Sequence, residues 1–478
     1  MNSIYSKIKE LHKKTYGKEA ESVELMQESG SYRKYFRIKN ANTSIIAVFN
    51  QDLKENDAFI SFTKSFASLG LKVPEIYANF KDEGIYFQQD LGSMTLFDHI
   101  AKKQDPKQMP EEIIRWYKQV LHDVLDFQIK ASPILDYSKC YPRAVFDRQS
   151  MMWDLNYFKY YFLKFSRVQF DEQALEYDFQ RFVKYLLEAP VDFFMYRDLQ
   201  SRNIMIHKDQ VYFIDYQGGR KGFPAYDVAS LLYDAKANLS NELREELLQY
   251  YVNLLEKQYH FPAAEFMKYY YGFVYIRIMQ AFGAYGFRGF YERKEHFLKS
   301  IPYAIKNMEY LLQHASIPND FPEMRKTWEQ LIDIYQSNTD GEQDKKLNVR
   351  IFSFSYRRGI PLDKSGNGGG FVFDCRVLEN PGKQEKFKKL NGKDKEVADF
   401  LSQQADVEDF TNHTKALCFT NIDVYLKRNF SNLMLCFGCT GGQHRSVYMA
   451  EKIHQLIKEK YNNTINIQLM HKEINHGE

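Results

Sequence analysis

The sequence is poor in several features that mark particular classes of protein. Five cysteines in 478 residues are too few for a disulfide-stabilised secreted scaffold and favour a reducing compartment. No run of 18 apolar residues occurs, because Arg277 and Gln280 interrupt the best candidate, so a buried helix is expected there instead of a membrane span. A net charge of +3 is too small to indicate nucleic-acid or membrane binding by itself. The first residues lack the apolar core of a signal peptide, so we expect a soluble, cytoplasmic protein.

The length and the hydrophobic periodicity predict two domains. A chain of 478 residues exceeds one ordinary core, and its 44% apolar content is typical of globular proteins. Short strand-like segments and one amphipathic helix fill the first hundred residues, and mostly helical periodicity follows. The polar segment 336–347 is the clearest linker, and strand-like segments alternate with helix-like ones after it. We therefore expect an α+β protein with domains at 1–335 and 348–478.

The segment from Met195 to Asp215 carries polar groups at a spacing that suits phosphoryl transfer. Asp198 stands five residues before Asn203, and Asp215 ends the next apolar run. Phosphoryl transfer needs a carboxylate near the acceptor hydroxyl and oxygen ligands for Mg2+ beside the nucleotide phosphates. Asp198 would be the catalytic group, and Asn203 and Asp215 would bind the metal. A β-hairpin with capping Asp and Asn residues is the structural alternative.

The neighbours of these residues make the pattern more specific. Arg197 precedes the aspartate, an apolar run follows Asn203, and Ile214 precedes Asp215. The pattern resembles the aminoglycoside phosphotransferase-like kinases, which are relatives of the protein kinases. Tyr196 stands where that family usually carries a histidine, a residue that mainly orients the loop. The resemblance implies a bilobal, protein-kinase-like domain with ATP and Mg2+ as cofactors.

Other stretches resemble the sugar kinases of peptidoglycan recycling, which phosphorylate N-acetylmuramate and N-acetylglucosamine. The stretch SGSYRKYFRI is similar to their nucleotide loop, GIYFQQDLGSMTL to their approach to adenine, and WDLNYF to a stretch with a sugar-binding carboxylate. The resemblance covers about residues 5–315 and implies these roles: Ser29, Gly30 and Ser31 for nucleotide phosphate, Gln89 and Leu91 for adenine, and Asp154 for the sugar. A hairpin turn, a strand end and a surface-helix aspartate are the respective alternatives. We expect Asp227 to cap a helix.

One part of a kinase site is missing from the sequence. Kinases usually carry a lysine on the third strand, where it binds nucleotide phosphates. The matching stretch SIIAVFN ends in Asn50 and contains no lysine. Arg33, Lys34 or Arg37 could contact phosphate instead, although each residue is more often a solvated charge. The sequence therefore leaves the phosphate-binding cation unassigned.

A second glycine-rich loop, CFGCTGGQHRS, lies between a strand-like and a helix-like segment near the C-terminus. The backbone N–H groups of such a turn at a helix N-terminus form an anion site, and arginine suits phosphate geometry. Cys439 and Arg445 also match the Cys-x5-Arg spacing of cysteine phosphatases, in which a thiolate attacks phosphate. Cys436 and Cys439 could form a redox pair or half of a zinc site, but buried thiols beside a strand are the simpler explanation.

Residues 348–474 resemble the C-terminal domain of the RNase adaptor RapZ. The stretches FSFSYRRGIPLD, FVFDCRVLENPG and GCTGGQHRSVYMAE carry the resemblance. It implies binding of glucosamine-6-phosphate and of RNA, with a sugar-phosphate site formed by Thr440, Gly441, Gly442, His444 and Arg445. Gly382 stands where some members carry a ligand-contacting histidine. No Gly-x4-Gly-Lys-Ser/Thr motif of an ATPase P-loop occurs, so the kinase-like domain takes the place of the ATPase domain.

The charge of this second domain is a weak argument for RNA binding. Residues 348–478 contain 19 Lys and Arg against 15 Asp and Glu, which leaves +4. Such an excess supports RNA binding only if the basic side chains gather on one face. The segment 385–395 is a candidate basic patch, and a solvated loop is the alternative. RNA binding and homo-oligomerisation both stay open.

The two resemblances together predict an ATP-dependent phosphotransferase that acts on a hydroxyl of an amino sugar. The second domain would bind an amino-sugar phosphate and regulate the first, because both domains point to the same class of metabolite. One alternative is a catalytically weak kinase-fold adaptor that senses glucosamine-6-phosphate and binds RNA or protein. The other is a phosphatase built on Cys439. The sequence does not identify the acceptor sugar or the hydroxyl used.

Overall fold

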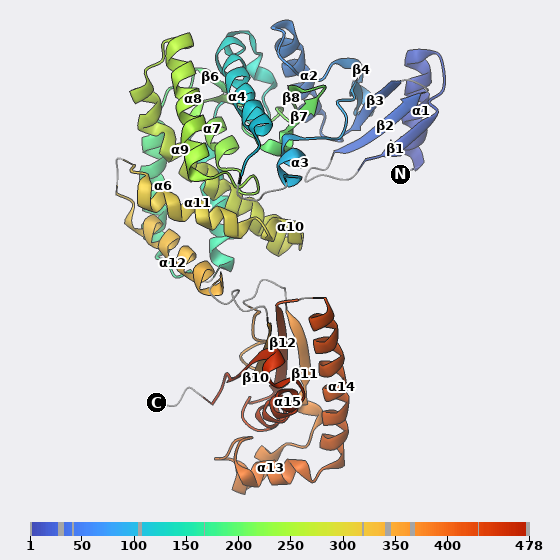
Figure 1. Ribbon diagram of the computed structural model, residues 1–478, viewed down its shortest axis with the longest axis vertical. Coiled ribbons are helices and arrows are strands. Elements are labelled where there is room, and N and C mark those ends of the chain that lie inside the picture. The colour runs from blue at the N-terminus through green and yellow to red at the C-terminus, as the bar shows by residue number, and fades with distance from the viewer. Residues whose placement is uncertain are drawn as a thin grey trace. The chain divides into compact units, whose positions relative to one another are not determined.

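The computed structural model describes residues 2–26, 33–40, 43–103, 108–166, 168–317, 320–339, 346–363, 369–428 and 430–474. Within them the chain divides into two compact units, Met1–Asp333 and Ile334–Glu478. The first unit combines an antiparallel sheet with a large set of helices, and the second is a parallel sheet with helices (Figure 1). The predicted α+β class is confirmed.

The first unit begins with a five-stranded antiparallel sheet. Its strands lie in the order β1 (Ser22–Leu25), β2 (Lys34–Asn40), β3 (Thr43–Phe49), β5 (Ile85–Gln89) and β4 (Ile76–Phe80). The helix α1 (Asn2–Tyr16) covers one face, where Ile8 packs against Phe36 and Phe87. The helix α2 (Leu53–Ser68) packs on the opposite face, where the Phe59 ring stacks on Tyr86 at a centroid distance of 5.4 Å.

Helices dominate the rest of the first unit. They are α3 (Leu96–Ala101), α4 (Glu111–Leu125), α5 (Arg148–Tyr161), α6 (Glu172–Leu186), α7 (Ala225–Leu232), α8 (Asn241–Tyr259), α9 (Ala263–Tyr285), α10 (Glu295–Leu298), α11 (Ile301–His314) and α12 (Pro322–Thr339). The buried helix predicted around Arg277 is α9. It approaches α5 closely, because a Cβ at Gly283 would lie 2.6 Å from the Tyr157 ring. None of the described helices is long and apolar enough to cross a bilayer.

Two short strand pairs hold the loops between the sheet and the helices. The strand β6 (Phe193–Met195) pairs with β9 (Arg220–Gly222), and β7 (Ile204–His207) forms an antiparallel hairpin with β8 (Gln210–Phe213). The segment that the sequence marked as a phosphoryl-transfer site connects these four strands. The predicted hairpin is therefore present, and it carries the polar residues at its base.

The second unit is a four-stranded parallel sheet in the order β11 (Gly370–Asp374), β12 (Asn432–Cys439), β10 (Leu347–Ser355) and β13 (Ile465–His471). The helices α13 (Lys395–Ser402), α14 (Ala405–Lys427) and α15 (Arg445–Tyr461) complete the unit (Figure 1). All three helices contribute to one core with the sheet, for example through Leu401, Ile422 and Ile453. Phe352, Phe354, Met434 and Cys436 form a smaller buried cluster on the other face.

The structure corrects one boundary that the sequence predicted. The expected linker began at residue 336, but α12 continues to Thr339, and β10 begins at Leu347. Residues 340–345 lie outside the described part of the chain. A polar composition does not distinguish a loop from a helical turn, because the backbone of either can satisfy its hydrogen bonds.

Candidate functional site

The residues predicted for catalysis meet at the base of the β7–β8 hairpin. Asp198 follows β6, and Asn203 ends a short 3-10 turn directly before β7. The pairing of Ile204 with Phe213 brings Asn203 next to Asp215, which lies just past the end of β8. The Asn203 Nδ2 donates to the Asp198 carbonyl at 2.8 Å and to Asp215 Oδ2 at 3.3 Å. Three residues that the sequence linked only by spacing therefore share one site.

The Asp198 carboxylate is free to accept a hydrogen bond from a substrate. It makes no hydrogen bond or ion pair with any side chain or backbone group that the structure describes. Burial raises the pKa of Asp198 above its usual value, and the guanidinium groups of Arg197 and Arg277 oppose that rise. A carboxylate with a raised pKa is a stronger base, which suits a group that accepts the proton of a hydroxyl.

Asp227 anchors the backbone of the catalytic loop. It is fully buried inside α7 and accepts hydrogen bonds from the backbone N–H groups of Tyr196 at 2.8 Å and Arg197 at 2.9 Å. Arg197 has a φ of 81°, a strained conformation that these bonds help to hold. Burial raises the pKa of Asp227 to about 7. The expectation that Asp227 caps a helix is wrong, because α7 has Pro224 at its N-cap and no side-chain cap.

Tyr196 performs an orienting role from the position where the family usually has histidine. Its hydroxyl donates to the backbone carbonyl of Ile214 at 2.5 Å, one residue before Asp215. The ring is completely buried and lies edge-on to Tyr216 at a centroid distance of 6.0 Å. Tyr196 thereby ties the loop of Asp198 to the strand end that presents Asp215.

Arg33 is a buried cation directly before β2, the strand that pairs with the third strand, which lacks a lysine. Its side chain is 2% exposed, and one of its terminal nitrogens lies 2.6 Å from Glu55 Oε1. The other donates to Asp215 Oδ1 at 3.3 Å. Asp52 caps α2 by accepting the N–H of Glu55, which fixes that glutamate in the first turn. The arginine therefore connects α2 with the predicted metal ligand.

Arg33 is more deeply buried than Lys34 and Arg37, the other two candidate cations in the sequence. Arg37 forms a two-bond ion pair with Asp90, at 2.7 and 3.0 Å, beside the end of β5. Lys34 is only partly buried at the start of β2. Of the three candidates, Arg33 is the one whose described contacts include the base of the catalytic hairpin.

Asp154 is buried and already has a partner. Its carboxylate binds the Arg197 guanidinium through two hydrogen bonds, at 2.6 and 2.8 Å. The rings of Phe146 and Tyr226 lie 5.1 and 5.0 Å from the same guanidinium. The alternative of a surface-helix aspartate is therefore wrong, and Asp154 positions the residue that precedes Asp198.

The predicted nucleotide-binding residues are only partly within the described structure. Ser29, Gly30 and Ser31 lie outside the described residues. Gln89 ends β5, and its N–H donates to the Glu75 carbonyl at 2.8 Å. Leu91 follows in the extended segment, where its carbonyl lies 3.1 Å from His207 Nδ1. The Gln89 N–H already donates to the Glu75 carbonyl and is not available to adenine. The candidate adenine contact is therefore the segment after β5.

Two buried arginines near Asp198 were missed as site residues in the sequence. Arg220 donates two hydrogen bonds to the Gly218 carbonyl, and a Cβ at Gly218 would lie 3.7 Å from Asp198 Oδ2. Arg277 donates to the Ser230 hydroxyl at 2.9 Å from the middle of α9. The one sequence signal was Arg277 itself, a charge within an otherwise apolar helix.

The second unit gathers its candidate residues at one edge of the sheet. All four strands are parallel, so their last residues, Ser355, Asp374, Cys439 and His471, lie at the same edge. Open α/β sheets bind ligands at this edge. The predicted sugar-phosphate residues form the connection from β12 to α15, and the Ser355 hydroxyl donates to the Thr440 carbonyl at 2.7 Å.

The loop between β12 and α15 is built around the Cys439 thiol. The Gly442 N–H donates to Cys439 Sγ at 3.2 Å, and the Ser446 hydroxyl lies 3.1 Å from the same sulfur. Gly442 has a φ of 72°, and a Cβ there would lie 2.3 Å from Glu473 Cγ and 2.9 Å from the Ser355 backbone nitrogen. Only glycine fits this position, which fixes the shape of the turn.

The two cationic candidates of this loop are held by backbone carbonyls. His444 Nε2 lies 2.9 Å from the Phe387 carbonyl. Arg445 is buried, and its Nη1 donates to the carbonyls of Arg376 at 3.0 Å and Leu378 at 2.9 Å. Its Nε is buried without a hydrogen-bond partner among the described residues, so one donor next to the loop remains for a bound anion.

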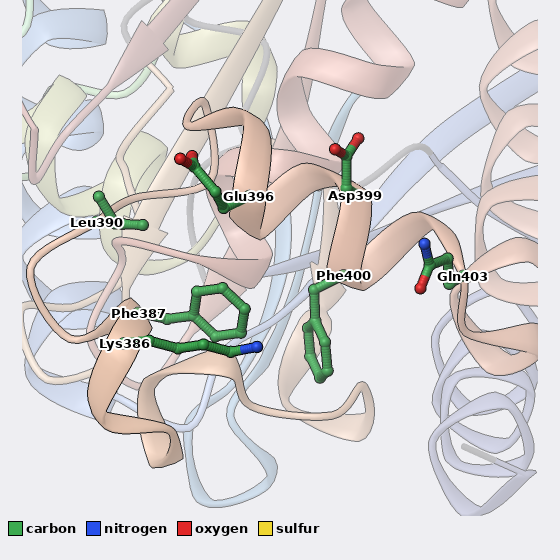
Figure 2. Close-up of a pocket in the computed structure, with 7 residues that line it drawn as sticks. All are labelled: Lys386, Phe387, Leu390, Glu396, Asp399, Phe400 and Gln403. Carbon is green, nitrogen blue, oxygen red and sulfur yellow. The ribbon is translucent and has the colours of Figure 1, made fainter.

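A pocket of about 380 Å3 lies in the second unit between the turn before α13 and α13 itself (Figure 2). The rings of Phe387 and Phe400 lie 5.3 Å apart there, and the Lys386 ammonium lies 4.6 Å from the Phe387 ring. Glu396 and Asp399 add acidic groups from α13. None of the predicted sugar-phosphate residues lines this pocket, so it does not coincide with the loop site.

Curated proteins match between 27% and 35% of the chain. A nucleotide-binding protein of Histophilus somni (strain 2336) is 31% identical over 171 residues, which are 35% of this chain and 56% of that protein. A nucleotide-binding protein of Methylococcus capsulatus is 38% identical over 129 residues, 27% of this chain and 41% of that protein. The chain spans about half the length of the curated relatives it matches. The family model described as the RapZ C-terminal domain matches residues 347–475.

The first unit is matched by a second family model and by solved structures. A choline kinase of Streptococcus pneumoniae has a TM-score of 0.41 at 15% identity, covering 69% of this chain and 98% of its own. A choline kinase of Cryptosporidium parvum has a TM-score of 0.46 at 12% identity, covering 68% and 99%. The model of the phosphotransferase enzyme family matches residues 25–265, which is 241 of 478 residues. The chain therefore belongs to the phosphotransferase enzyme family and carries a RapZ C-terminal domain behind its kinase-like domain.

Proposed function

We propose that this protein transfers the γ-phosphoryl group of ATP to a hydroxyl of an amino sugar of the N-acetylglucosamine or N-acetylmuramate type. The observation that carries the proposal is the unengaged Asp198 carboxylate beside Asn203 and Asp215. Asp198 would orient the acceptor hydroxyl and take its proton as the new oxygen–phosphorus bond forms. The amino-sugar class is supported by the RapZ C-terminal domain, whose resemblance implies an amino-sugar phosphate as ligand.

Asn203 and Asp215 fit a bound Mg2+. An amide oxygen and a carboxylate are hard ligands, and Mg2+ in such sites takes the rest of its shell from water and phosphate. The described residues contain no cluster of three or more His, Cys, Asp and Glu that could hold a metal, so this pair is the candidate. When bound, the ion would neutralise charge on the nucleotide phosphates.

Arg33 takes the role of the missing third-strand lysine in this proposal. A kinase needs a cation that is held by a glutamate of the first-lobe helix and faces the phosphates. Arg33 meets the first condition through Glu55 of α2 and lies beside Asp215, where the phosphates and metal would be. Its planar guanidinium binds two phosphate oxygens as readily as two carboxylate oxygens.

The test is a measurement of ADP release with Mg2+ and ATP. The acceptors are N-acetylglucosamine, N-acetylmuramate, glucosamine and an aminoglycoside, and the matched variant is Asp198→Asn. Turnover on one amino sugar that the variant loses would establish the reaction and its acceptor together. Nucleotide binding without turnover on any acceptor would instead favour the adaptor that senses glucosamine-6-phosphate.

For the C-terminal domain we propose binding of a sugar phosphate without hydrolysis. Hydrolysis by a cysteine phosphatase would need Arg445 to grip the substrate phosphate while Cys439 attacks it. Arg445 instead donates one terminal nitrogen to two backbone carbonyls, so it cannot present both terminal nitrogens to a phosphate. The N–H groups of the turn at the start of α15 remain suited to an anion. Hydrolysis of an aryl phosphate that disappears in Cys439→Ser would contradict this proposal.

We also propose that the sugar phosphate regulates the kinase-like domain. Regulation requires that the ligand of one domain changes the affinity of the other domain for its own ligand. The assay is the KM for ATP and for the acceptor, with and without saturating glucosamine-6-phosphate. Equal KM values under both conditions would rule out this coupling while leaving both binding sites intact.

A further inference from the structure

We infer that the acceptor carries an anionic group, a carboxylate or a phosphate, and that Arg220 and Arg277 bind it beside Asp198. This inference rests on the proposed phosphoryl transfer and names the chemical class of its acceptor. It follows from three features of the described structure: the burial of both arginines, their lack of acidic partners, and their position around the catalytic carboxylate.

Both arginines are buried cations without a direct ion pair among the described residues. Arg220 is 6% exposed and Arg277 is 5% exposed. Neither forms an ion pair with a carboxylate among the residues that the structure describes, and their hydrogen bonds go to neutral groups, the Gly218 carbonyl, the Ser230 hydroxyl and the Gln280 amide oxygen. One terminal nitrogen on each, Nη1 of Arg220 and Nη2 of Arg277, donates to none of these described groups. A buried charge without a partner is costly, and such charges are normally paired.

Three buried guanidinium groups act on Asp198, and among the described residues only that of Arg197 has a direct carboxylate partner. Arg197 is already neutralised by Asp154 through two hydrogen bonds. Arg220 and Arg277 both act on the charge of Asp198, and so does the second carboxylate, Asp215. Burial and the positive charge of Arg197 together lower the pKa of Arg220 to about 10. An acceptor anion would give Arg220 and Arg277 the direct partner that they lack among the described residues.

The positions of the two arginines place this anion next to the reacting hydroxyl. Arg220 binds the carbonyl of Gly218, and a Cβ at Gly218 would lie 3.7 Å from Asp198 Oδ2. Arg277 comes from α9 and acts on the charge of Asp198, so we assign it to the acceptor side of the site. A cationic acceptor such as an aminoglycoside would face the same two charges and be repelled. The site therefore selects an acceptor that is negatively charged near its reacting hydroxyl.

The test compares related amino sugars that differ in charge. N-acetylmuramate adds a carboxylate to the ring of N-acetylglucosamine, N-acetylglucosamine 6-phosphate adds a phosphate, and glucosamine carries a positive charge. We expect the KM of one anionic sugar to lie about tenfold or more below that of neutral N-acetylglucosamine, as for a charge-assisted hydrogen bond. The preferred sugar identifies the anion as carboxylate or phosphate.

Variants at Arg277 show whether the arginines cause the preference. Arg277→Gln should bring the KM of the anionic sugar close to that of N-acetylglucosamine, and Arg277→Lys should keep most of the preference. Arg115→Gln is the control, since Arg115 pairs with Asp209 on the exposed surface of α4. Equal KM values for neutral and anionic sugars in the wild type, or a preference that survives Arg277→Gln, would overturn the inference.

A binding measurement separates this inference from the reaction itself. The shift in melting temperature of the protein with Mg2+ and ADP is recorded for each sugar, so no turnover is needed. A stabilisation by the anionic sugar that Arg277→Gln removes would support the inference even if no phosphoryl transfer occurred. If KM and the shift in melting temperature were the same for neutral and anionic sugars, the inference would be refuted, but the proposed phosphoryl transfer would not.

Discussion

The most informative perturbation of the kinase-like domain is Arg33→Met, which removes the buried cation and keeps an aliphatic chain of similar length. In the wild type one terminal nitrogen of Arg33 lies 2.6 Å from Glu55 and the other 3.3 Å from Asp215. If Arg33 binds the nucleotide phosphates, its loss removes a preorganised charge from the transition state. Losing one such donor typically lowers kcat by about 10² to 10³.

The same variant should destabilise the fold by a smaller amount. Removing one partner of a buried ion pair costs about 3–5 kcal/mol when both partners are buried. Here Glu55 and Asp215 are 31% and 35% exposed, so water can solvate them once Arg33 is gone. We therefore expect a loss of about 1–2 kcal/mol, since screening by solvent reduces the worth of the pair.

The assay combines steady-state kinetics with a titration of a fluorescent ATP analogue in the presence of Mg2+. Arg33→Met should weaken nucleotide binding and lower kcat, and Arg33→Lys should recover part of both. Lys39→Met is the control, because Lys39 forms an exposed ion pair with Glu24 at the opposite end of β2. If Arg33→Met left kcat and nucleotide affinity within about twofold of the Lys39→Met values, Arg33 would not be the phosphate-binding cation.

Three further predictions concern single residues. Asp198→Asn should abolish turnover. It should also raise the free energy of unfolding at pH 7, because the raised pKa of Asp198 shows that the folded protein disfavours the ionised carboxylate. In urea titrations this gain in stability should vanish below about pH 4, where the carboxylate is protonated in the folded and the unfolded protein. Tyr196→Phe should cost about 1–2 kcal/mol in urea unfolding, because the Ile214 carbonyl loses its donor. Gly442→Ala should abolish calorimetric binding of glucosamine-6-phosphate, whereas Gly359→Ala, also at positive φ but with no atom within 4 Å, should not.

The grouping of the candidate catalytic residues could be predicted from the sequence because their order along the chain determines their geometry. Asp198, Asn203 and Asp215 lie within one loop and one hairpin, so short-range spacing is enough to bring them together. Arg33 could not be assigned in this way. Its partner Asp215 is 182 residues away, and only the packed structure shows which of several neighbouring cations is buried.

Two elements of the second unit escaped prediction for a physical reason. The helix α14 buries Val407, Thr411, Thr414, Cys418 and Ile422, and the two threonines weaken the apolar stripe that would reveal a helix. The edge strand β13 buries only its first and last residues fully, so its alternation is faint. Both patterns become clear only when α15 and β10 supply the surfaces against which they pack.

At the two positions that depart from the kinase pattern, other residues take over the missing contacts, which argues against a loss of activity. An adaptor with a decayed site would be expected to leave the histidine and lysine positions without their contacts. Instead, Tyr196 reaches the carbonyl before Asp215, and Arg33 is held by Glu55 and Asp215 in a buried position. Each substitute keeps a contact that the site needs, and a buried arginine without a task would be selected against because of its desolvation cost. The geometry of these two residues therefore favours a working phosphotransferase over an adaptor that has lost its chemistry.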